Sequence, residues 1–129
     1  TITEGWCGDA AQIVPIVDHL AKLNANIEHR LILRDEHLDV IDQFLTSGSR
    51  SIPVTVLMDA ETLDVLGSWG PRPGELQEWY MDKKKKDDFV WKEASAHMHK
   101  WYAKDRGVQT QLEFTESLKK AIASIELVF

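Results

Sequence analysis

Residues 5–17 read GWCGDAAQIVPIV, and this stretch decides the fold. A Trp-Cys pair between two glycines is followed by apolar residues at helical spacing, which predicts a helix from about Cys7 to Leu23. Pro15 lies inside this helix, where it removes one backbone donor. The spacing therefore places Cys7 at the start of a helix, beside N–H groups that have no partner within the helix.

The segments that follow alternate between strand and helix patterns. Residues 28–33 predict a strand, and residues 36–45 predict a short helix. β-Branched and apolar runs at 54–58 and 63–66 are joined by a polar turn, which predicts a hairpin. This order indicates an α/β protein.

Only helical patterns occur from residue 75 to the end of the chain. Gly107 separates the last two predicted helices, and residues 110–113 (TQLE) fit a capping box at the start of the final one. His97 and His99 lie two apart on a helix and point away from each other, so we expect no metal site there.

Composition narrows the range of partners. The chain has 129 residues with a formal net charge of -6, which argues against nucleic acid as the main partner. No apolar run approaches the ~20 residues that cross a bilayer, so we expect no membrane partner. The single cysteine excludes an internal disulfide and fits a reducing compartment, so we expect a cytoplasmic protein, although a targeting segment upstream would not be visible.

The position of Cys7 suits thiol chemistry. A cysteine at the first turn of a helix meets unpaired N–H groups and the positive end of the helix dipole, which favour thiolate over thiol. The carboxylate of Asp9 in the same turn is expected to oppose this effect. A proline such as Pro53 lacks an N–H, and in cis form it can leave a backbone edge open beside a thiol.

These landmarks, in this order, resemble the thioredoxin family over about residues 4–80. The matching features are Trp6-Cys7-Gly8-Asp9-Ala10, the helical Pro15, Ile52-Pro53 before the hairpin, and the glycines and helix start of residues 65–76. The resemblance implies a three-layer α/β sandwich with a mixed sheet and a cis Ile52–Pro53 bond facing Cys7. It also implies a single domain over 1–129, comprising a core at 1–80 that lacks its upstream elements and C-terminal helices at 81–129. The expected setting is a bacterial cytoplasm.

The chain departs from the family motif at its second cysteine, where Ala10 stands. Cys7 can form a mixed disulfide but cannot resolve it alone. Resolution would need a low-molecular-weight thiol, a thiol of a partner protein, or a second copy that gives a Cys7-linked dimer. The local pattern differs from that of monothiol glutaredoxins, and we expect no cofactor. The residues expected to bind a substrate chain around Cys7 are Trp6, Gly8, Asp9, Ala10, Ile52, Pro53, Trp69 and Gly70.

Two functions remain open from the sequence. In the first, the protein is a thiol–disulfide oxidoreductase or redox sensor that acts through Cys7 on protein thiols or disulfides. In the second, Cys7 is a small buried residue without chemistry, and the fold is a redox-inactive module that binds a protein partner. The sequence does not decide between these two functions.

Overall fold

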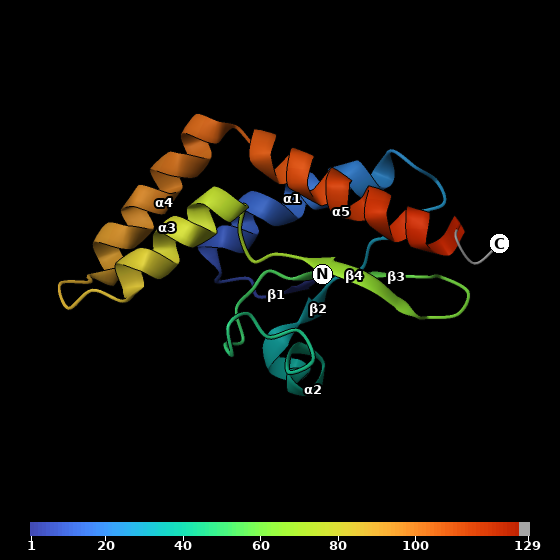
Figure 1. Ribbon diagram of the computed structural model, residues 1–129, viewed down its shortest axis with the longest axis horizontal. Helices are drawn as coiled ribbons and strands as arrows, with labels where there is room; N and C mark the ends of the chain where they lie inside the picture. The colour runs from blue at the N-terminus through green and yellow to red at the C-terminus, as the bar shows by residue number, and fades with distance from the viewer. Residues whose placement is uncertain (127–129) are drawn as a thin grey trace.

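The computed structural model describes residues 1–126 and has short strands joined in two pairs (Figure 1). The strands are β1 (Ile2–Thr3), β2 (Ile32–Leu33), β3 (Thr55–Met58) and β4 (Val65–Trp69). β1 and β2 pair in parallel, whereas β3 and β4 pair antiparallel. Two backbone hydrogen bonds between Ile2 and Val54, of 2.8 and 3.1 Å, join the two pairs. The strands thus form one parallel and one antiparallel two-stranded sheet linked by a single bridge, an arrangement compatible with the predicted α/β class, and not one continuous mixed sheet.

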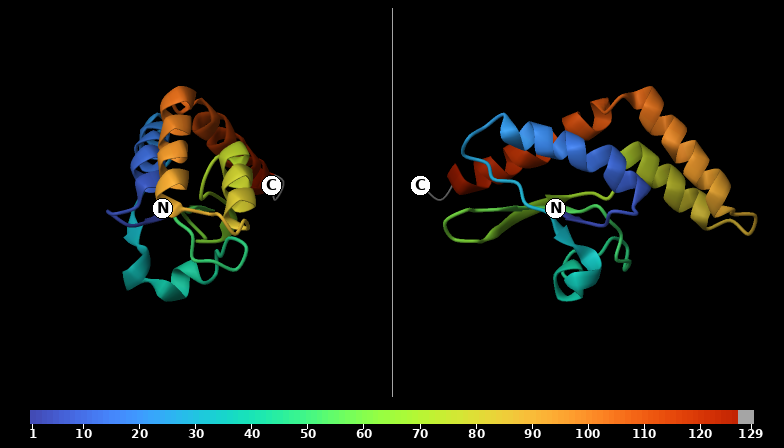
Figure 2. Two further views of the ribbon diagram at one scale, coloured as in Figure 1. Left: turned by 90° about the vertical axis from the view of Figure 1, so that its left-hand side faces the viewer. Right: turned by 180° about the vertical axis from the view of Figure 1, so that it is seen from behind.

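Helices cover the strands on both faces. They are α1 (Gly8–Lys22), the 3-10 turn η1 (Arg34–Glu36), α2 (Leu38–Ile41), α3 (Gly74–Lys84), α4 (Trp91–Asp105) and α5 (Val108–Glu126). α1 and α5 lie over one face of the strands, and α2 lies beneath the other (Figures 1 and 2). α3 and α4 lie side by side and extend beyond one end of the strands. Within residues 1–126, no helix is long and apolar enough to cross a membrane.

Two apolar clusters hold these layers together. The first joins four helices and contains Ile13, Val17, Leu76, Met98, Tyr102 and Phe114. The second lies where the strand pairs meet and contains Ile2, Ile41, Ile52 and Val54. Cys7 is partly buried against the second cluster. The cysteine is thus anchored between the start of α1 and the strands.

The predicted strand at 28–33 and helix at 36–45 are shorter in the structure. β1 provides ladder partners only for Ile32 and Leu33, and a strand requires such partners. The helical pattern at 36–45 is divided between η1 and α2, which are separated by His37. The helices predicted to begin near residues 7 and 75 are found at Gly8 and Gly74.

The capping box predicted at residues 110–113 is wrong. α5 begins two residues earlier, after Arg106 and Gly107, which both have left-handed backbone angles, with φ of 56° and 76°. Thr110 is buried inside the helix, and a Cβ on Gly107 would lie 2.7 Å from Ile16 Cδ1. The tight turn and the close approach of α1 therefore set the start of α5.

Candidate functional site around Cys7

Cys7 is the N-cap residue of α1, as the sequence predicts, and its side chain is partly buried. Its thiol donates a hydrogen bond to the Ile52 carbonyl oxygen, with a sulfur–oxygen distance of 3.6 Å. The Ile52–Pro53 peptide bond is cis. The sulfur therefore lies beside the cis-proline segment, although the two are 45 residues apart in the chain.

A cleft of about 400 Å³ opens next to Cys7. Four of the predicted binding residues line this cleft together with Cys7: Trp6, Gly8, Asp9 and Ile52. The indole of Trp6 is 65% exposed at the rim. Ala10 and Pro53 are buried and do not line the cleft. Their contribution is to the packing beneath it.

Trp69 and Gly70 lie outside the lining of the cleft. The Trp69 indole packs edge-on against Phe114 of α5, and its Nε1 donates to Glu113 at 3.3 Å. Gly70 has a φ of +135°, and a Cβ there would lie 2.3 Å from the Pro53 carbonyl oxygen. Gly70 therefore packs directly against the backbone of Pro53, where only a residue without a side chain fits.

The Asp9 carboxylate has partners from two distant elements. Its Oδ2 forms an ion pair with Arg72 Nη2 at 2.9 Å, and its Oδ1 accepts a hydrogen bond from the Tyr102 hydroxyl at 2.6 Å. The Asp9 and Arg72 side chains are each only 9% exposed. The repulsion between Asp9 and a Cys7 thiolate that the sequence suggests is therefore offset by a buried positive charge.

Arg72 and Tyr102 are themselves held in place. Arg72 Nη1 donates to Gln77 at 2.9 Å, and its guanidinium lies 4.3 Å from the centre of the Tyr80 ring. Burial raises the pKa of the Tyr102 hydroxyl, and the negative charge of Asp9 raises it further. Tyr102 therefore stays protonated and continues to donate to Asp9.

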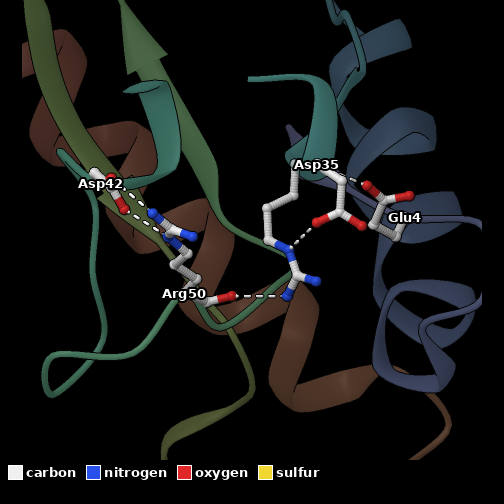
Figure 3. Close-up of polar contacts among 5 residues, drawn as sticks. Glu4, Asp35, Asp42 and Arg50 are labelled. Atoms are coloured by element: carbon white, nitrogen blue, oxygen red, sulfur yellow. Dashed lines mark hydrogen bonds and ion pairs between the residues drawn. The ribbon is translucent and has the colours of Figure 1, made fainter. Parts of the chain in front are cut away.

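Arg34, which lines the cleft, belongs to a network of charged side chains (Figure 3). Arg34 donates to the Arg50 carbonyl oxygen at 3.0 Å and pairs with Asp35, while Arg50 makes two hydrogen bonds to Asp42. The Arg34 guanidinium also lies 5.0 Å from the centre of a Trp6 ring. These contacts tie the segment before Ile52 to η1 and α2.

Sequence reasoning missed the contribution of α3 and α4 to the site. Arg72, Lys84, Trp91, His99 and Tyr102 all line the cleft. His99 lies so near Gly8 that a Cβ there would be 3.1 Å from the imidazole. The only signal for Arg72 was its place between two prolines, and Tyr102 matched an ordinary core position. Neither pattern indicates a partner as distant along the chain as Asp9.

His97 and His99 point in different directions, as their spacing predicts. His97 stacks on Trp79 with 3.9 Å between ring centres, whereas His99 contacts Gly8. These two imidazoles have separate environments.

Comparison with known proteins supports the fold and the landmarks. A protein-family model described as thioredoxin matches residues 1–89. Curated proteins and solved structures gave no match. The matched residues include Cys7, the Ile52–Pro53 segment and Arg72, and they make up more than half of the chain. The chain therefore belongs to the thioredoxin family.

Proposed function

We propose that this protein carries out thiol–disulfide exchange through the single thiol of Cys7. The observation that carries this proposal is the position of the sulfur at the start of α1, 3.6 Å from the carbonyl oxygen before the cis proline and at the edge of a cleft. The plainer alternative, a buried structural cysteine, fits less well because Cys7 is accessible from that cleft.

The chemistry has two steps. The Cys7 thiolate attacks one sulfur of a substrate disulfide, so a mixed disulfide forms and the other sulfur leaves as a thiolate that takes a proton from water. An external thiolate then attacks the substrate sulfur of the mixed disulfide, which releases the Cys7 thiolate. The external thiol is required because Ala10 replaces the second cysteine of the family motif.

The cleft is consistent with a small anionic thiol as this external thiol. Arg34, Arg72 and Lys84 line it, and Asp9 is the one carboxylate among its lining residues. The charge of Asp9 is already paired with Arg72, and Arg34 is paired with Asp35, so among the described residues Lys84 is the lining cation left without an ion pair, although the chain has a formal net charge of -6. A volume of about 400 Å³ lies within the range of small-molecule sites. Protein disulfides in a cytoplasmic setting are the other substrates we propose.

The test is to mix the reduced protein with oxidised glutathione and record the intact mass. We expect one glutathione adduct on the wild type, its removal by added reduced glutathione, and no adduct on Cys7→Ser. In an insulin assay with thioredoxin reductase, we expect no sustained turnover, because each mixed disulfide stays unresolved without an added thiol.

Three other outcomes have defined meanings. An unreactive Cys7 would favour a redox-inactive module that binds a protein partner through the same cleft. A Cys7-linked dimer would appear under oxidation as a band on non-reducing electrophoresis that Cys7→Ser lacks. Sustained insulin reduction by the wild type without added thiol would contradict the monothiol mechanism.

A further inference from the structure

The Asp9 carboxylate belongs to the first turn of α1 but is bound by side chains from elsewhere. A carboxylate in this position is normally stabilised by the N–H groups and the dipole of its own helix. Here one oxygen is held by Arg72, which precedes α3, and the other by Tyr102 of α4. Both oxygens are therefore engaged by partners outside α1.

Cys7 needs the donors that Asp9 leaves unused. The thiol donates to the Ile52 carbonyl oxygen, and as N-cap residue Cys7 makes no side-chain capping bond to α1. A thiolate has no proton to donate, so on ionisation it loses the bond to Ile52 and requires N–H donors. The first turn of α1, which follows Cys7 directly, supplies N–H donors that have no partner within their own helix.

We propose that Arg72 and Tyr102 are positioning residues for the chemistry of Cys7. They keep the Asp9 carboxylate away from the N–H groups of the first turn of α1, so that these N–H groups can stabilise the Cys7 thiolate. This inference rests on the proposed function of Cys7. It assigns a role in the site to α4, which begins at Trp91, beyond the residues matched by the family model.

Burial makes Asp9 and Arg72 depend on each other for the stability of their charges. Asp9 and Arg72 are both nine-tenths buried, so either charge alone would be poorly solvated. The pKa of Tyr102 is raised by the negative charge of a Cys7 thiolate as well as by that of Asp9, so Tyr102 lies within electrostatic reach of both. The Tyr102 hydroxyl can be removed with little loss of packing, because Tyr102→Phe keeps the buried ring and deletes only the hydrogen bond to Asp9.

Other titratable or charged groups also face this cleft. They are Arg34, Tyr80, Lys84 and His99. Within residues 1–126, none of the four has a hydrogen bond or ion pair to Asp9, which binds only Arg72 and Tyr102. Ser124→Ala serves as a matched control, since it deletes a hydroxyl together with its hydrogen bond to the Ala121 carbonyl oxygen on α5, outside the cleft lining.

The experiment measures the rate of Cys7 alkylation by iodoacetamide as a function of pH. We expect Tyr102→Phe to shift the profile to higher pH and to lower the rate at pH 7 about threefold. The Asp9 Oδ1 that loses Tyr102 then turns toward the N–H groups at the start of α1, while Oδ2 stays paired with Arg72. The double variant Asp9→Asn, Tyr102→Phe should have the same pH profile as Asp9→Asn alone. Ser124→Ala should match the wild type.

The proposal is overturned if folded Tyr102→Phe has the wild-type profile, or if its shift is the same in the Asp9→Asn background. Should Tyr102→Phe lose its helical circular dichroism, Arg72→Lys is measured in the same two backgrounds, because it keeps the positive charge and removes the paired donors. Iodoacetamide requires no disulfide partner. If the alkylation profile depends on Asp9 but Cys7 does not exchange with glutathione, only the proposed function is rejected. If Cys7 exchanges with glutathione but its profile does not depend on Asp9, only this inference is rejected.

Discussion

At the scale of single residues, Ala10 decides which chemistry Cys7 can complete. It is buried in the first turn of α1, three residues after Cys7, with 4% of its surface exposed. Residues three apart on a helix lie on one face, so Ala10 occupies the place from which a second thiol would attack a mixed disulfide. The Asp9 side chain between them is turned toward Arg72 and Tyr102.

We predict that Ala10→Cys forms an internal disulfide with Cys7. Side chains at this spacing lie about 5 to 6 Å apart at Cβ, and a modest local adjustment brings the two sulfurs within bonding distance. After equilibration in glutathione buffers, free-thiol counts should fall from two to none, and the variant should reduce insulin repeatedly. Ala11→Cys is the control, because residue 11 is exposed on another face of the helix and should keep both thiols free. Two free thiols in oxidised Ala10→Cys would contradict the placement of Cys7 at the helix start.

At the scale of elements, the start of α3 depends on a side chain of α5. Its N-cap residue is Pro73, which offers no capping side chain. Both carboxylate oxygens of Glu113 accept a hydrogen bond from the Gly74 N–H at 3.0 Å, and one also accepts from Trp69. Glu113 thus performs, from another helix, the task usually given to an N-cap residue. It also joins the end of β4 to α5.

We expect Glu113→Ala to lower the free energy of unfolding by about 1–2 kcal/mol, because the Gly74 N–H and the Trp69 indole lose their acceptor. Glu113→Gln should lose less, since it keeps one oxygen acceptor but gives up the charge at the helix start. Urea denaturation measures both changes. Glu116→Ala, an exposed site on the same helix, should stay within about 0.5 kcal/mol of the wild type. Equal losses at positions 113 and 116 would show that α3 does not rely on this contact.

At the scale of the whole molecule, exposed carboxylates join segments that lack regular structure. Hydrogen bonds from Lys22 and His29 lower the pKa of Asp18 below its ordinary value of 3.8, and hydrogen bonds from Arg50 do the same for Asp42. Backbone N–H groups of Thr62 and Glu61 lower the pKa of Asp59 in the hairpin turn. These contacts secure the connection after α1, the loop before Ile52 and the β3–β4 turn.

These shifts predict the sign of the acid response. Each carboxylate has a lower pKa in the folded protein than in the unfolded chain, so its contribution is complete above about pH 5 and is lost as the pH falls through the folded value. We therefore expect the thermal unfolding midpoint to fall between about pH 5 and pH 2. Replacing Asp18, Asp42 and Asp59 together by Asn should flatten this dependence. An unchanged dependence in the triple variant would assign the acid response to other groups.

The sequence by itself determined the position of Cys7 at a helix start, the hairpin and the helical C-terminal third, while the cis Ile52–Pro53 bond was implied by the family resemblance. The first three features follow from local rules: helical spacing of apolar residues, β-branched runs, and the effects of glycine and proline on the backbone. The family motif then predicted which segments would surround the cysteine. Its missing second cysteine also limited the chemistry to one thiol.

Only the tertiary structure decided what surrounds the thiol. Asp9 binds Arg72 and Tyr102, and Glu113 accepts a hydrogen bond from the start of α3. The partners are 39 to 93 residues apart in the chain. No local pattern encodes these pairs, since a buried charge requires a partner wherever the fold can supply one. The same reason explains the false capping box, because Glu113 binds α3 instead of its own helix start. Whether Cys7 meets a carboxylate or a neutralised pair thus depends on how the segment before α3, with Arg72, and α4, with Tyr102, pack against the start of α1.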